Sequence, residues 1–141
     1  MNKQVIIRNN AVSIIVHTLL CTLTYVLFNV PTPFNHEAIL TISFFISVLL
    51  AILNPWLYFL CGRRFLRNTQ DRKQNILSVA SLPIFVIIFT IIPNQLLNWI
   101  NAPFAILVSF IGHSVGVTGY LILALLPSAV LYSGMIVGNK E

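Results

Sequence analysis

The chain has 141 residues, of which 57% are hydrophobic and only 8% are charged, and its formal net charge at pH 7 is +5. With a mean hydropathy of +0.90, this composition excludes an ordinary soluble domain and indicates an integral membrane protein. The cations cluster at the ends of apolar segments, where anionic lipid headgroups lie, so we expect membrane lipids and not nucleic acid as partners.

The first apolar segment covers residues 11–28 and follows a short stretch that carries Lys3 and Arg8. A signal peptide has a similar pattern, but it ends in a small-x-small cleavage site, and no such site follows here. We therefore predict that residues 11–28 form the first membrane-spanning helix. Pro31 and Pro33 mark its end.

The second predicted span covers residues 38–60, a length close to the roughly 20 residues that cross the hydrocarbon core. Asn54 and Pro55 interrupt it. Because proline removes a backbone donor and clashes with the preceding turn, we expect a kink there. Trp56 and Tyr58 follow, approaching the interface where amphipathic rings are favoured.

One segment carries a local resemblance, from Leu53 to Phe65, which reads Leu-Asn-Pro-Trp-Leu-Tyr-Phe-Leu-Cys-Gly-Arg-Arg-Phe. It resembles the last span and following basic helix of rhodopsin-like receptors, and it shares their Asn-Pro-x-x-Tyr pattern and out-to-in direction. The resemblance covers only this short segment, two further apolar segments follow it, and the chain is too short for seven spans. A kinked span, an interfacial Tyr and a basic loop meet the same physical demands in both cases, so we infer no family.

Residues 61–74 form a basic stretch that holds five of the eight Lys and Arg residues. Because Lys and Arg close to spans are retained in the cytoplasm, we predict a cytoplasmic loop that fixes the orientation of the chain. Its cations are candidates for contact with lipid headgroups or with a partner: Arg63, Arg64, Arg67, Arg72 and Lys73.

The third predicted span, residues 75–92, is short and ends at Pro93. In the stretch 94–101 that follows, three asparagines share one helical face and the apolar residues fall largely opposite. This spacing predicts a short helix that lies in the outer membrane interface.

The last apolar segment, residues 104–137, is longer than one upright span requires, so the chain has to bend, tilt or re-enter the membrane. In one model a re-entrant piece, Phe104 to Ile111, precedes a span that begins at Gly116. In the other, one helix runs from Phe104 and is kinked at Pro127. A stripe of small residues at helical spacing favours the kinked helix and close packing against another helix. The stripe consists of Ser109, Gly112, Gly116 and Gly119.

Together these segments predict a single all-α membrane domain, a four-helix bundle with both termini in the cytoplasm. This topology places all eight Lys and Arg residues on the same side of the membrane. The high Ile and Asn content is typical of an AT-rich bacterial genome, so we expect the bacterial cytoplasmic membrane as the location.

Polar residues at membrane depth are the first places to look for a functional site, and the sequence offers His17, Asn54, His113 and Ser114. The predicted topology puts His17 in the cytoplasmic half and His113 in the outer half, which argues against one shared haem iron. Ser114 and His113 are neighbours and point to different helix faces, and no buried carboxylate is available to orient the histidine. No cluster supplies the ligands that zinc requires. We therefore predict no catalytic residue, metal site or cofactor.

The leading functional hypothesis is a non-enzymatic membrane protein that acts through helix packing with another membrane protein, as an accessory, assembly, regulatory or immunity subunit. The expected partner is therefore a membrane protein or, under the second hypothesis, further copies of the chain in a homo-oligomer. Such a role needs no buried charge, and every charged residue falls at a span end or in a loop. A second hypothesis is a small oligomeric transporter or channel for a neutral or lipid-like substrate. A third is an intramembrane redox protein or enzyme that uses His17 or His113. Enzymatic activity is undecided, with the balance against it.

Overall fold

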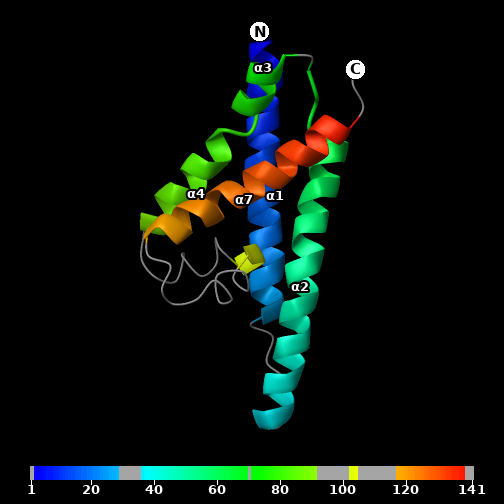
Figure 1. The fold of residues 1–141 in the computed structure, drawn as a ribbon, viewed down its shortest axis with the longest axis vertical. Coiled ribbons are helices and arrows are strands. Elements are labelled where there is room, and N and C mark those ends of the chain that lie inside the picture. Colours follow the sequence, from blue (N-terminus) through cyan, green and yellow to red (C-terminus); the bar gives the residue numbers. More distant parts are fainter. Residues whose placement is uncertain (1, 29–35, 70, 92–101, 105–116, 139–141) are drawn as a thin grey trace.

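The computed structural model describes residues 2–28, 36–69, 71–91, 102–104 and 117–138 (Figure 1). In these ranges the chain is helical and forms no β-sheet, which confirms the all-α prediction. The elements are α1 (Lys3–Phe28), α2 (His36–Phe65), α3 (Arg72–Leu77), α4 (Ser81–Ile91), the 3-10 turn η1 (Ala102–Phe104) and α7 (Val117–Val137).

Three helical stretches of the described chain are long and apolar enough to cross a membrane: Lys3–Leu27, Phe45–Phe65 and Arg72–Phe89. A fourth, Ala124–Val137, is apolar but shorter. The membrane-facing character is visible on α2, where large apolar side chains recur at helical spacing on an exposed face. They are Phe45, Leu49, Ile52 and Trp56. These features support the membrane class, while the four-helix bundle stays a prediction.

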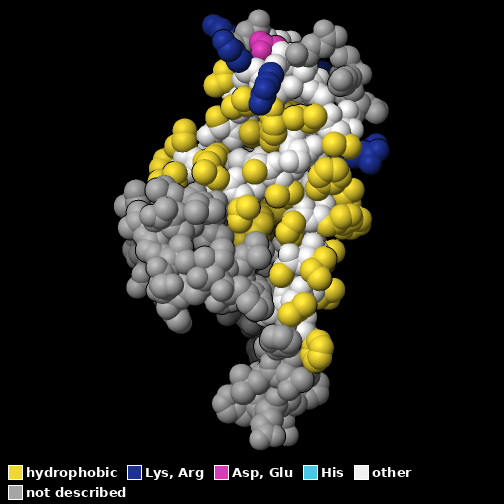
Figure 2. All heavy atoms as spheres, in the orientation of Figure 1, with side chains coloured by type: hydrophobic (Ala, Val, Ile, Leu, Met, Phe, Trp, Pro, Cys, Tyr) yellow, Lys and Arg dark blue, Asp and Glu magenta, His cyan; other side chains and the backbone are white. Residues whose placement is uncertain are grey.

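Positive charge gathers at one end of the molecule. Figure 1 shows the amino-terminus, α3 and the carboxyl ends of α2 and α7 at this end, and Figure 2 shows Lys and Arg side chains clustered there above a largely hydrophobic surface. We call it the basic end. The cations that the structure describes lie on α1, at the end of α2, in the connection after α2 and on α3: Lys3, Arg8, Arg63, Arg64, Arg67, Arg72 and Lys73. The structure thus brings the start of α1, the end of α7 and the basic stretch together. Which side of the membrane they face is still a prediction.

Helix α7 packs most extensively against α2, and glycines make this close approach possible. A Cβ atom on Gly62 would overlap the Leu131 carbonyl, and one on Gly134 would overlap the Phe59 carbonyl. A Cβ on Gly138 would lie 2.8 Å from the Arg63 carbonyl oxygen. The two backbones are therefore in direct contact, as in small-residue helix pairs of membrane proteins.

The third apolar segment differs from its predicted form, because the structure divides it into α3 and α4. The break has a local cause: Pro83 lies in the first turn of α4, and a proline ring there would clash with the carbonyl of Val79 if one helix ran through both. Helix α3 also starts earlier than predicted, since the Asp71 carboxylate caps it by accepting from the backbone N–H groups of Lys73 and Gln74. The non-helical part of the basic stretch is consequently shorter than 61–74, because α2 continues to Phe65.

The last segment is helical through Pro127, which lies inside α7. Phe104, the predicted start of a long kinked helix, lies instead at the end of the 3-10 turn η1 and is buried. Residues 105–116, which distinguish the kinked helix from the re-entrant model, are outside the described residues. The interfacial helix predicted at 94–101 also falls outside the described residues.

Candidate functional site

Two places in the described structure hold polar side chains from several elements. The first is the contact between the middle of α1 and the carboxyl-terminal half of α2. His17 Nδ1 lies 2.7 Å from the Tyr58 hydroxyl, and the Cys21 sulfur lies 3.4 Å from His17 Nε2. The rings of Phe85 from α4 and Phe104 from η1 pack against His17 and Tyr58, with centroid distances of 6.5 and 5.3 Å respectively. Four elements therefore meet around one buried histidine–tyrosine pair.

Asn54 lies one turn before Tyr58 on α2 and belongs to the same contact. The Thr24 hydroxyl donates to Asn54 Oδ1 over 3.4 Å, and Asn54 Nδ2 donates to the Pro103 carbonyl over 3.0 Å. All three residues are buried. These bonds join α1, α2 and η1, so the polar groups at this depth serve as contacts between elements.

The structure thus brings two of the sequence candidates, His17 and Asn54, to the same helix contact. The other two, His113 and Ser114, lie outside the described residues, as do the stripe residues Ser109, Gly112 and Gly116. Gly119, the remaining stripe residue, lies in the first turn of α7. Within the described part of the chain, no three His, Cys, Asp or Glu side chains are grouped so that they could hold a metal ion.

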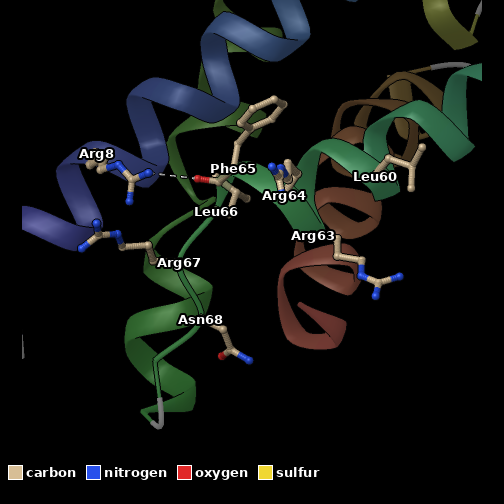
Figure 3. A pocket seen from close by; sticks show the side chains of 8 residues that line it. All are labelled: Arg8, Leu60, Arg63, Arg64, Phe65, Leu66, Arg67 and Asn68. Carbon is tan, nitrogen blue, oxygen red and sulfur yellow. Dashed lines mark hydrogen bonds between the residues drawn. The ribbon is translucent and has the colours of Figure 1, made fainter. Parts of the chain in front are cut away.

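The second place is a hollow at the basic end with a volume of about 630 Å³, which we call the arginine groove. Figure 3 shows Arg8 and Arg67 on one side of it and Arg63 on the other. Helix α1 contributes Arg8, while α2 and the connection after it contribute the rest. The lining residues are Arg8, Leu60, Arg63, Arg64, Phe65, Leu66, Arg67 and Asn68.

The charge of the groove is positive and is not balanced by its own lining. Four of the eight lining residues are Arg, and none is acidic. Arg8 donates from Nη2 to the Phe65 carbonyl over 3.4 Å, which leaves its charge unneutralised. Asp71, the acidic residue whose side chain the structure describes, accepts from the α3 backbone instead. Four arginines with exposed side chains therefore line a partly apolar hollow.

A buried asparagine fixes the position of the groove wall. Arg67 donates its backbone N–H to Asn9 Oδ1 over 3.1 Å, and Asn9 Nδ2 donates back to the Arg67 carbonyl over 2.9 Å. Asn9 is fully buried on α1. Its amide thus satisfies both backbone groups of Arg67, which ties the connection after α2 to α1 and leaves the Arg67 side chain free of that contact.

Further asparagines hold the neighbouring elements. Asn68 Nδ2 donates to the Ile136 carbonyl of α7 over 3.2 Å, and Asn75 Nδ2 donates to Asn68 Oδ1 over 2.8 Å. Asn10 joins α1 to both α3 and α4, because its Nδ2 donates to the Leu77 carbonyl and its Oδ1 accepts from the Ser81 N–H. The basic end is therefore a hydrogen-bonded junction of all four long elements and α3.

Only some of the cations predicted to contact lipid headgroups or a partner lie at the groove. Arg63, Arg64 and Arg67 line the groove, whereas Arg72 and Lys73 lie in the first turn of α3, outside the groove lining. Arg8 completes the groove and was not among the predicted site residues. The sequence signal for Arg8 was its charge at the start of a span, which predicted its side of the membrane but not its neighbours.

Compared with models of protein families, with curated proteins and with solved structures, the chain matches none of them.

Proposed function

We propose that this chain is a non-enzymatic integral membrane protein that binds the anionic headgroup of a membrane lipid in the arginine groove. The observation that carries this proposal is the lining of the groove, four Arg and no acidic residue. A guanidinium group presents donors in a fork that matches the oxygens of a phosphate. The volume of about 630 Å³ lies within the range of small-ligand sites, roughly 300–1,000 Å³.

The position of the groove along the helices supports a lipid as its ligand. Arg8 lies in the second turn of the apolar stretch Lys3–Leu27, and Arg63 and Arg64 lie in the last turn of Phe45–Phe65. Cations at the ends of spans are at the depth of the lipid headgroups. Leu60, Phe65 and Leu66 add an apolar wall, which suits the glycerol and acyl part of a lipid better than a soluble anion.

The accessory role expected from the sequence, helix packing with another membrane protein, is the wider context of this proposal. It is supported by the exposure of every charged side chain that the structure describes, since packing in a membrane needs no buried charge. Native mass spectrometry of protein extracted gently from its own membrane tests it, and a stoichiometric membrane protein is the expected result. A symmetric homo-oligomer with a retained small molecule would favour the transporter or channel. A Soret band in the absorption spectrum of the purified protein would favour the redox protein.

Lipid binding is tested on purified, delipidated full-length protein in detergent, titrated with phosphatidylglycerol or phosphatidylcholine and read by native mass spectrometry. The triple variant Arg8→Gln, Arg64→Gln, Arg67→Gln should lose the preference for phosphatidylglycerol by roughly tenfold or more, because each cation near a headgroup adds attraction. The Asn9 bonds should survive in this variant, since they involve only the backbone of Arg67.

The matched control removes the same number of charges at the same end, as Lys3→Gln, Arg72→Gln, Lys73→Gln. None of these three residues lines the groove. We expect the control to keep most of the preference. An equal loss in both variants would show that overall charge and not the groove governs binding, and would refute the proposed site. Circular dichroism and gel filtration establish that both variants are folded.

A further inference from the structure

We infer that the lipid in the arginine groove carries at least two negative charges on its phosphate groups, and that one bound molecule bridges α1 and α2. This inference rests on the proposed function and deepens it. It concerns which class of anionic lipid the groove selects and what the lipid does to the helices.

The number of charges is the first argument. The four guanidinium groups supply four positive charges, and the carboxyl end of α2 at Phe65 offsets roughly half a charge through its helix dipole. A single phosphodiester carries one negative charge and leaves most of the positive charge without a counter-charge. A headgroup with a phosphomonoester or with two phosphodiesters neutralises more of it and is therefore favoured.

The placement of the charges is the second argument. Arg8 comes from α1, whereas Arg63 and Arg64 come from the last turn of α2. In Figure 3, Arg8 and Arg67 lie on the side of the groove opposite Arg63. One phosphodiester has two free oxygens and engages guanidiniums on one side. A ligand with more phosphate oxygens reaches cations of both helices at once.

The apolar wall is the third argument, and it identifies a lipid as the source of the phosphate. Leu60, Phe65 and Leu66 line the groove together with the arginines, and the Phe65 side chain is 51% exposed. An exposed phenyl ring beside guanidinium groups offers a surface for glycerol and acyl carbons. A free phosphate would make no use of this wall.

The test uses delipidated full-length protein in detergent and compares ligands at equal phosphate concentration by native mass spectrometry. The ligands are diphosphatidylglycerol, phosphatidic acid, phosphatidylglycerol, phosphatidylcholine and inorganic pyrophosphate. We expect the first two to bind roughly fivefold or more tightly than phosphatidylglycerol, since each extra charge pair at the headgroup depth adds about one such factor. Pyrophosphate should bind more weakly than either.

The bridge between helices is tested by Arg8→Gln, with Lys3→Gln as the matched control on the same helix. Arg8→Gln should reduce the binding of the two-charge lipids to the level of phosphatidylglycerol, and Lys3→Gln should leave the discrimination in place. Discrimination that is unchanged in Arg8→Gln would overturn the bridge. Circular dichroism of both variants separates this result from unfolding.

The remaining outcomes distinguish this inference from the proposed function. Equal binding of phosphatidylglycerol and diphosphatidylglycerol, both tighter than phosphatidylcholine, would overturn the inference and leave the lipid site standing. Equal binding of all four lipids would refute the proposed function as well. Pyrophosphate binding as tight as that of the lipids would overturn the assignment of a lipid and point to a soluble phosphate ligand.

Discussion

Several buried polar side chains of α1 and α2 find hydrogen-bond partners in other parts of the chain. His17 pairs with Tyr58, Thr24 with Asn54, and Asn9 with both backbone groups of Arg67. In apolar surroundings an unpaired polar group costs more than in water, so each of these residues constrains where its partner has to lie. At the scale of single residues, the polar groups thus specify how the helices dock.

Replacing Tyr58 by Phe tests this at the most buried pair. The change removes the hydroxyl that lies 2.7 Å from His17 Nδ1 and keeps the ring against Phe104. We expect the free energy of unfolding in detergent to fall by about 1 kcal/mol, the usual size of such a bond. Tyr132→Phe on α7, at a half-buried ring, is the control and should change it little. A variant at Tyr58 as stable as the control would show that this bond adds no net stability.

The sequence predicted part of this residue-scale arrangement. It marked His17 and Asn54 as polar residues at membrane depth, because both lie inside apolar segments long enough to span a membrane. It did not predict Tyr58, Thr24 or the Pro103 carbonyl as their partners, since these contacts depend on how the helices are rotated and on where η1 lies. Arg8 was missed as a groove residue for the same reason.

At the scale of elements, the contact between α2 and α7 rests on glycine. Gly134 faces the Phe59 carbonyl and Gly62 faces the Leu131 carbonyl, so the glycines of each helix receive the backbone of the other. The sequence also holds the small-residue pair Gly134-x-x-x-Gly138, which was not among the predicted packing residues. The predicted stripe from Ser109 to Gly119 lies earlier in the same segment. Spacing alone does not name the facing helix, so α2 as the partner had to come from the structure.

Gly134→Ala tests this contact, because the change in helix propensity favours the variant and the overlap with α2 disfavours it. Alanine favours a helix interior over glycine by about 1 kcal/mol, but its methyl group would overlap the Phe59 backbone, and overpacking costs about 1–3 kcal/mol. We expect net destabilisation, seen as a lower midpoint of thermal unfolding in detergent. Ala129→Leu adds a larger group on an exposed face of α7 and should leave the midpoint nearly unchanged. A higher midpoint in Gly134→Ala would contradict the close contact.

At the scale of the whole molecule, the described Lys and Arg side chains gather at one end, which is the arrangement that the predicted topology requires, while the side of the membrane stays a prediction. The rule that keeps cations on one side of a membrane acts on each loop separately, so it could be applied without knowing how the helices pack. The prediction of which residues meet was weaker. Pro83 divides the third segment into α3 and α4. The non-helical part of the basic stretch is shorter than the predicted 61–74, because α2 continues to Phe65 and Asp71 caps α3.

Labelling with a membrane-impermeant thiol reagent tests the orientation in intact cells. In a background with Cys61 replaced by Ser, cysteines are introduced singly at Lys3, Lys73 and Asn98. In intact cells we expect labelling of Asn98→Cys only. Lys3→Cys and Lys73→Cys should be labelled only after lysis, because both positions belong to the predicted cytoplasmic side. Labelling of Lys3→Cys and Lys73→Cys in intact cells would show the opposite orientation and would leave the described fold unaffected. Labelling at one of positions 3 and 73 without the other would contradict their common location, since the neighbouring Asn2 N–H donates to Gln74 Oε1 over 3.0 Å.

The arginine groove has walls from two distant parts of the chain, since Asn9 holds Arg67 in place and Arg8 faces the end of α2. It consequently exists only when α1 and α2 are associated. A lipid bound in it would add to the stability of that association by mass action, by about 2.7 kcal/mol at a concentration one hundred times the Kd. The lipid composition of the bilayer would thereby enter the folding equilibrium of the protein.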